Sequence, residues 1–209
     1  MKSKSIATLL VAGALASVPL ACAQKNEVSG VIGRTFIDSQ TITGATFTNP
    51  QVNFGDGTTV EISYARKVKG DGFWALALEV PFNWNPDEDL NAGTNAIPSG
   101  YKAYFITPGV RLNVFADNVV SPWVAFGGGF GHFSSSSQLQ YNSGPNTGNT
   151  GSTSGVFDLG GGVDFNLRKH WGLRFTARNY WSGVPVLNVT TNKTRQSNLF
   201  VGMGAIFRF

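Results

Sequence analysis

A histidine and a serine lie two positions apart at His132 and Ser134. Side chains alternate between the two faces of a β-strand, so on a strand this pair would share one face. A serine hydroxyl beside a base can attack an acyl ester, and a carboxylate usually orients the histidine. No glutamate follows Glu88, and the alternation pattern points Asp158 to the opposite face. We therefore expect an ordinary strand histidine beside a serine-rich loop, and a non-catalytic protein.

Charged side chains of both signs form a second candidate group. They are sparse, and they alternate with large apolar residues along extended segments. Inside a narrow barrel these charges could pair with one another, as buried charges must. We expect a charge network in the lumen, formed by Arg34, Glu61, Glu79, Arg111, Asp158, Asp164, Arg174 and Arg178.

Other chemistry has little support in the sequence. The chain has two histidines and one cysteine, Cys22, so no metal site with sensible ligand spacing is expected. The glycine-rich runs follow strand alternation and lead into no helix, which argues against phosphate or cofactor binding. No cluster of lysine and arginine indicates a nucleic-acid partner. We expect neither a cofactor nor a nucleic-acid ligand.

The N-terminus has the layout of a secretory signal peptide. A short basic stretch precedes an apolar run over residues 6–20, and small residues follow at Ala21 and Ala23. We expect a signal peptide over residues 1–23 and a single domain over residues 24–209. Lipoprotein processing at Cys22 is the alternative, although Pro19 stands where that processing prefers an aliphatic residue. Without Lys2 and Lys4 the mature chain is nearly neutral.

The rest of the chain alternates between apolar and polar or small residues with a period of two. In residues 198–209, for example, Leu199, Val201 and Met203 alternate with glycines. Such segments of roughly ten residues match the length of membrane-crossing strands. The pattern predicts eight strands, at residues 28–37, 60–65, 74–83, 106–114, 122–133, 157–166, 173–181 and 198–209.

The expected connections alternate between short and long. Short ones fall near residues 68–71, 116–121 and 168–171, whereas residues 38–57, 84–101, 134–154 and 183–197 form long polar loops. Short periplasmic turns and long outward loops are typical of up-and-down barrels in the outer membrane. This pattern also places both ends of the mature chain on the periplasmic side.

Alternation alone also fits a soluble β-sandwich with an aromatic core. Here the polar face is rich in glycine, which would cover a water-exposed surface poorly. Aromatic residues also gather near the strand ends, as in the aromatic girdles of membrane barrels. The sequence therefore favours an all-β, eight-stranded, antiparallel up-and-down transmembrane β-barrel. The residues expected in the two girdles are Phe82, Trp84, Tyr104 and Trp181 at one level, and Trp74, Trp171 and Phe209 at the other.

The last strand resembles the C-terminal signal that the bacterial barrel-assembly machinery recognises, with Phe207 and Phe209 in the final positions. The segments 126–131 and 159–165 resemble strands of the small OmpA/OmpX-like outer-membrane barrel family. The resemblance covers nearly all of residues 26–209. It implies location in the bacterial outer membrane, contact with its lipids and lipopolysaccharide, and a monomeric state. We expect no periplasmic domain after the eighth strand.

An eight-stranded barrel leaves room only for side chains inside, so a wide aqueous channel is not expected. We expect a non-catalytic barrel that presents polar loops and supports envelope integrity or surface interaction. Two alternatives stay open. His132 and Ser134 resemble the His-x-Ser pair of PagL-type lipid A deacylases, and a small pore or a transporter of hydrophobic molecules would also use this fold.

Overall fold

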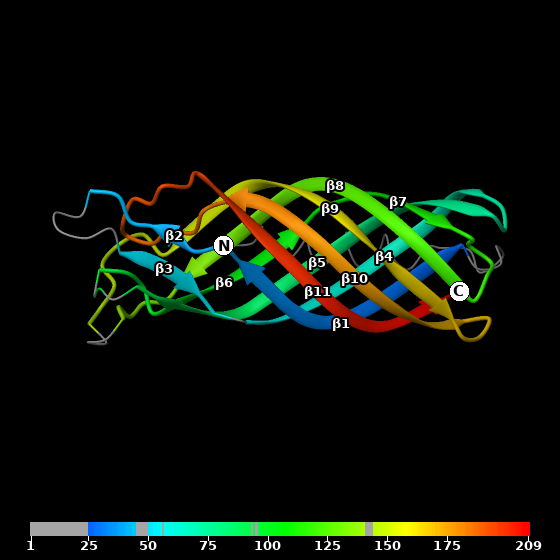
Figure 1. The fold of residues 1–209 in the computed structure, drawn as a ribbon, viewed down its shortest axis with the longest axis horizontal. Coiled ribbons are helices and arrows are strands. Elements are labelled where there is room, and N and C mark those ends of the chain that lie inside the picture. Colours follow the sequence, from blue (N-terminus) through cyan, green and yellow to red (C-terminus); the bar gives the residue numbers. More distant parts are fainter. Residues whose placement is uncertain (1–24, 45–49, 56, 93, 95, 141–143) are drawn as a thin grey trace, which may run out of the picture.

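The computed structural model describes residues 25–44, 50–55, 57–92, 94, 96–140 and 144–209. The expected signal peptide, including Cys22, lies outside these residues. In the described part the regular elements are all β-strands (Figure 1). No helix there is long and apolar enough to cross a membrane. The strands are β1 (Asn26–Ile37), β2 (Gln40–Thr41), β3 (Gln51–Phe54), β4 (Thr58–Gly70), β5 (Trp74–Asn91), β6 (Gly100–Ile106), β7 (Gly109–Val114), β8 (Val120–Ser135), β9 (Gly151–Asn166), β10 (Trp171–Gly183) and β11 (Arg195–Arg208).

Antiparallel pairing closes the long strands into a ring. β1 pairs with β4 on one side and with β11 on the other, and each remaining strand pairs with its neighbours along the chain. β6 and β7 occupy one position in the wall, because both pair with β5 and with β8. The wall of the ring therefore has eight strand positions, which confirms the predicted eight-stranded barrel.

The break between β6 and β7 falls at Thr107 and Pro108. Proline has no N–H group and cannot donate to a neighbouring strand. The Pro108 carbonyl still accepts a hydrogen bond from the Gly128 N–H, with a nitrogen–oxygen distance of 3.1 Å. The wall therefore continues past the break, and the sequence-based single strand over residues 106–114 is interrupted near its start.

All short turns lie at one end of the barrel and all long loops at the other (Figure 1). We call these the turn end and the loop end. The Asn26 and Phe209 backbones exchange two hydrogen bonds at the turn end, so β1 begins where β11 finishes. By the usual topology of such barrels, the turn end faces the periplasm.

At the loop end the strands extend further than the alternation predicted. β5 continues to Asn91, so the second loop covers only residues 92–99. The first loop, expected to be irregular, contains the small hairpin of β2 and β3, and β3 pairs with β5. The apolar-to-polar alternation stops where the strand leaves lipid, so it could not indicate these extensions.

The outer wall is apolar. Exposed apolar side chains occur on every long strand, and examples with more than half of their surface exposed are Ile32, Ile62, Leu78, Val124, Phe126, Leu159 and Met203. Aromatic rings gather toward both ends, as the girdle prediction requires. Phe157 stacks on Trp181 at the loop end, and Phe207 contacts Trp171 at the turn end, with ring centroids 5.7 Å and 4.8 Å apart.

Glycines on the lumen side make room for backbone and charged side chains. A Cβ atom at Gly204 would lie 1.9 Å from the Gly30 carbonyl oxygen, and one at Gly160 would lie 3.0 Å from Cγ of Arg178. Added side chains at these positions would collide with neighbouring groups. The lumen glycines therefore accommodate a filled interior.

Candidate functional site

The turn half of the lumen contains a cluster of ion pairs around Arg174. Its Nε lies 2.8 Å from Oδ1 of Asp164, and its Nη2 lies 2.8 Å from both Oδ2 of Asp164 and Oε1 of Glu27. Arg208 joins from β11, with its Nε 2.9 Å from Oε2 of Glu27. Glu27 and Asp164 thus each pair with both Arg174 and Arg208. Strands β1, β9, β10 and β11 are tied together through these pairs.

A second cluster surrounds Arg178 near the middle of the barrel. Its Nη1 lies 2.6 Å from Oδ2 of Asp158, and its Nη2 donates to Glu79 across the lumen. Its Nε lies 3.7 Å from Oε2 of Glu61, which also accepts a hydrogen bond from the Tyr180 hydroxyl at 2.7 Å. One guanidinium therefore meets carboxylates from three strands, β4, β5 and β9.

Arg111 on β7 links the two clusters. Its Nη2 lies 2.6 Å from Oε1 of Glu27, and its Nη1 lies 3.2 Å from Oε2 of Glu79. Trp123 lies beside the same network, with its ring centroid 5.2 Å from the Arg174 guanidinium carbon and 5.6 Å from that of Arg178. Charges so buried are stable only with partners of this kind.

Seven of the eight predicted network residues point into the lumen, and each has at most 3% of its surface exposed: Glu61, Glu79, Arg111, Asp158, Asp164, Arg174 and Arg178. The eighth assignment is wrong, because Arg34 is exposed on the outer face. Arg34 has the same even phase on β1 as Val28 and Ile32, whose exposed side chains form the lipid-facing side. Arg34 lies toward the loop end of β1, so its long side chain can extend to the level of the lipid headgroups.

Sequence reasoning missed three members of the network, namely Glu27, Arg208 and Trp123. The phase of Val28 would have placed Glu27 inside, because adjacent strand residues point to opposite faces. Arg208 alternates with the outward Phe207 and Phe209 in the same way. Trp123 alternates with the exposed Val124 on β8. A tryptophan among arginines gave no signal of its own.

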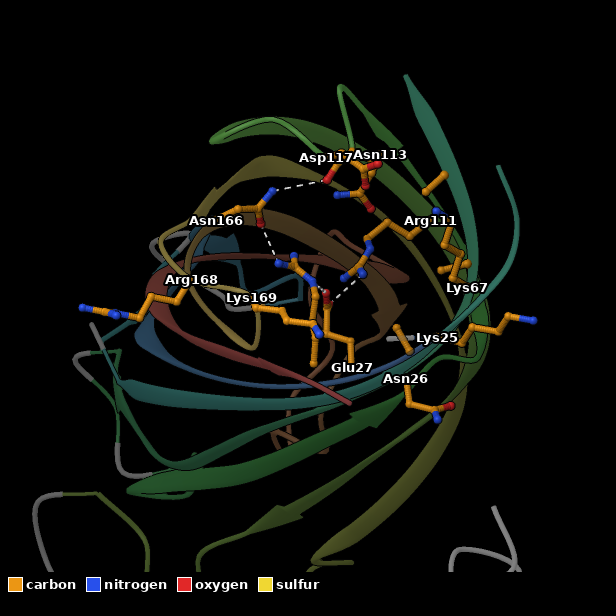
Figure 2. Close-up of a pocket in the computed structure, with 15 residues that line it drawn as sticks. Lys25, Asn26, Glu27, Lys67, Arg111, Asn113, Asp117, Asn166, Arg168 and Lys169 are labelled. Atoms are coloured by element: carbon orange, nitrogen blue, oxygen red, sulfur yellow. Dashed lines mark hydrogen bonds and ion pairs between the residues drawn. The ribbon is translucent and has the colours of Figure 1, made fainter. Parts of the chain in front are cut away.

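A cavity of about 460 Å³ opens below the network at the turn end (Figure 2). Figure 2 shows Glu27 near its centre, with the Arg111 side chain directed toward it. Asn113 and Asn166 also line the wall, and the Arg208 Nη1 bonds to Oδ1 of Asn166 at 2.5 Å. The charged residues that line the cavity are Lys25, Glu27, Lys67, Arg111, Asp117, Arg168, Lys169 and Arg208.

The loop half of the lumen contains an apolar cluster beside buried amide side chains such as Gln40 and Gln196. The Phe105 ring stacks on Tyr180 with centroids 5.2 Å apart, and it contacts Phe133 at 5.8 Å. These rings belong to a cluster that also includes residues from the loops. The other buried members are Val31, Ile42, Val52, Leu90, Ala92, Ile97, Tyr101, Ala103, Val156, Leu187 and Phe200. The described side chains therefore fill the lumen above the ion pairs.

His132 and Ser134 both face outward near the loop end of β8. The His132 Nδ1 lies 2.8 Å from the Thr153 hydroxyl, and its ring lies 5.5 Å from that of Tyr104. Asp158 points into the lumen and pairs with Arg178, so it cannot orient this histidine. In the described residues, no three histidine, cysteine or acidic side chains are placed to hold a metal ion.

A closed antiparallel ring with an apolar outer wall and a charged, filled lumen defines a membrane-spanning β-barrel. Residues 7–207 match the family described as outer membrane protein beta-barrel domain, and the chain belongs to that family. It is thus an outer-membrane β-barrel protein, as predicted from the sequence.

Two solved structures share this fold. Neisserial surface protein A is 15% identical, with 90% of this chain and 99% of that chain covered and a TM-score of 0.56. The outer membrane protein OprG from Pseudomonas aeruginosa is 12% identical, with 90% and 96% covered and a TM-score of 0.54. No curated protein matches the sequence.

Proposed function

We propose that this barrel is a non-catalytic, monomeric structural protein of the outer membrane that presents an ordered loop surface to the outside. The observation that carries the proposal is the filling of the lumen by the described side chains above the turn-end cavity. Ion pairs occupy the turn half above the cavity, and an apolar cluster occupies the loop half. A lumen filled in this way supports a structural role and argues against a channel.

The loops support the second part of the proposal, because they bond to one another. The first loop reaches the fourth through the Thr43 N–H and the Thr190 carbonyl, 2.8 Å apart. The fourth reaches the third through Nδ2 of Asn188 and Oδ1 of Asn146, also 2.8 Å apart. Ile42 and Leu187 anchor the first and fourth loops in the apolar cluster. A pre-ordered surface binds a partner at a smaller entropic cost than free loops would.

Complementation of a deletion strain separates the two roles. Wild-type protein should restore resistance to detergents and bulky antibiotics. A variant with exposed third-loop residues 147–149 replaced by glycine and serine should restore it equally, because these residues lie outside the lumen filling. Cells that carry the loop variant should lose adhesion or binding to surface partners, whereas cells that carry the wild type should retain it. Envelope defects that neither protein corrects would contradict the structural role.

Planar-bilayer recording tests the pore alternative. The purified protein should give a flat current trace at salt concentrations where open porins conduct, because the described lumen side chains leave no continuous path. Reproducible unitary steps would overturn the proposed structural role in favour of a small channel. Uptake of a hydrophobic dye into cells with and without the protein tests the transporter alternative in the same manner.

Mass spectrometry of lipid A tests the enzymatic alternative. Cells expressing the wild type and cells expressing His132→Ala should carry identical acyl chains, because His132 bonds to Thr153 and Asp158 is held inside the barrel. Loss of one acyl chain in the wild-type cells alone would establish a deacylase.

The mass of the mature protein tests export. We expect an N-terminus at Gln24, and a lipid-modified Cys22 would contradict this expectation.

A further inference from the structure

The cavity at the turn end is a blind pocket. Its walls are the inner faces of the strands near the periplasmic mouth, and its floor is the ion-pair network around Glu27 and Arg111. Above that floor the lumen is filled by buried side chains such as Arg178 and Phe105. The volume of about 460 Å³ lies within the range of roughly 300–1,000 Å³ that small-molecule sites occupy. Its form therefore suits binding better than passage.

The charge of the cavity wall is strongly positive. Six lysine and arginine side chains line it, against only two carboxylates, Glu27 and Asp117. Glu27 is already engaged by Arg111, Arg174 and Arg208. Arg111 and Arg208 are compensated by Glu27, Glu79 and Asp164, whereas Asp117 is the one further carboxylate in the described lining, beside four more cationic side chains. Figure 2 shows the charged ends of Lys25 and Arg168 directed outward, away from the centre of the cavity. An anion in the cavity would still be attracted by the excess of cationic side chains in its lining.

Arg111 supplies an independent indication of a ligand. Its side chain is only 3% exposed, lines the cavity and is directed toward the centre (Figure 2). Its Nη2 is bonded to Glu27, but its Nε makes no hydrogen bond to any described protein atom. The Nε atom has almost no accessible surface, so it would reach a bound anion only through a small shift of the side chain. A buried N–H group without an acceptor is costly, which favours such a shift.

We propose that the turn-end cavity binds a soluble, multiply charged anion that carries phosphate or carboxylate groups. Guanidinium groups match both groups with paired donors, and lysines add point charges. The cavity opens inside the ring of strands, so its ligand enters from the periplasmic solution and not from the bilayer. A phospholipid headgroup offers the same phosphate chemistry from the other source, and the experiment separates the two.

Calorimetry with inorganic pyrophosphate tests the site, using protein in a non-ionic, phosphate-free detergent. The wild type should bind in a saturable manner, and added sodium chloride should weaken binding by screening. The double variant Lys67→Gln/Lys169→Gln removes two charges from the cavity wall and should weaken binding about tenfold. The matched control, Arg66→Gln/Lys69→Gln, removes two exposed charges from the same end outside the cavity and should leave the affinity nearly unchanged.

Two results would overturn the proposal. Absence of saturable pyrophosphate binding by the folded wild type would do so. So would equal weakening in the cavity and control variants, since that would reflect only the general field of a basic rim. Native mass spectrometry of protein from phosphatidylglycerol-containing nanodiscs addresses the lipid source. Lipid retained by the wild type and lost by the cavity variant, without pyrophosphate binding, would replace the soluble anion with a headgroup.

Discussion

Arg174 and Asp164 face each other directly across β10 and β9, and two parallel hydrogen bonds of 2.8 Å join them. This fork-to-fork geometry is the strongest form of arginine–carboxylate pairing. Both residues are almost completely buried, at 2% and 0% exposed. Loss of either partner would therefore leave a buried charge without compensation.

Arg174→Ala should lower the free energy of unfolding by about 3–5 kcal/mol, because Asp164 and Glu27 would lose a buried partner. Urea titration of the refolded protein in lipid vesicles measures this loss. Arg34→Ala is the matched control, since it removes the same side chain from the exposed outer face, and we expect a change within about 1 kcal/mol. Similar losses in both variants would mean that the lumen network does not stabilise the barrel.

Gly204 and Gly30 provide a second matched comparison, because they lie in diagonal positions on the paired strands β11 and β1, with Gly204 on the lumen face and Gly30 on the outer face. A Cβ atom at Gly204 would strike the Gly30 carbonyl oxygen, whereas one at Gly30 would meet nothing within 4 Å. Gly204→Ala should therefore destabilise the barrel by about 1–3 kcal/mol through overpacking. Gly30→Ala should be neutral or stabilising by up to about 1 kcal/mol, since glycine weakens strands. Reversal of this order in urea titrations would contradict the described packing.

The membrane-crossing part of the fold was predictable because lipid imposes a strict period of two on each strand. The eight strand positions of the wall and the order of short and long connections follow from that period. The loop end was not predictable, because β5 between Trp84 and Asn91 runs beyond the bilayer, where both faces accept polar residues. The hairpin of β2 and β3 is stabilised by contacts with β5 that no local pattern reveals.

The members of the network were predictable on strands where inward and outward side chains alternate clearly. Arg174 and Arg178 were placed correctly because clear apolar partners flank them on β10. Arg34 was wrongly expected in the lumen, because residues 28–37 carry apolar side chains on both faces and the pattern there does not fix the phase. The outward phase of Val28 would have identified Glu27. The cavity beneath the network depends on side chains from several strands, and a single sequence does not show which of them meet.

Spin labels test which face meets lipid. Leu112, Leu159 and Val201 are 37%, 51% and 43% exposed on the outer wall. Cysteine-attached labels at these positions should be relaxed strongly by oxygen, which concentrates in the acyl chains, and weakly by a water-soluble nickel chelate. A label at the exposed loop residue Thr147 should show the opposite preference. Preference for the chelate at all four positions would indicate a water-exposed wall.

The C-terminal aromatics give a prediction about assembly. Phe207 and Phe209 are exposed and stack on each other with centroids 5.8 Å apart, beside Trp171. Their side chains contribute little to the lumen, so Phe209→Ala should leave the unfolding free energy of refolded protein nearly unchanged. It should nevertheless reduce the amount of folded barrel in the outer membrane of cells, if the assembly machinery reads this strand. Phe73→Ala, which removes another exposed aromatic from the same end, should not reduce it. Equal levels of the two variants, measured by heat-dependent gel mobility of the outer-membrane fraction, would show that Phe209 carries no assembly signal.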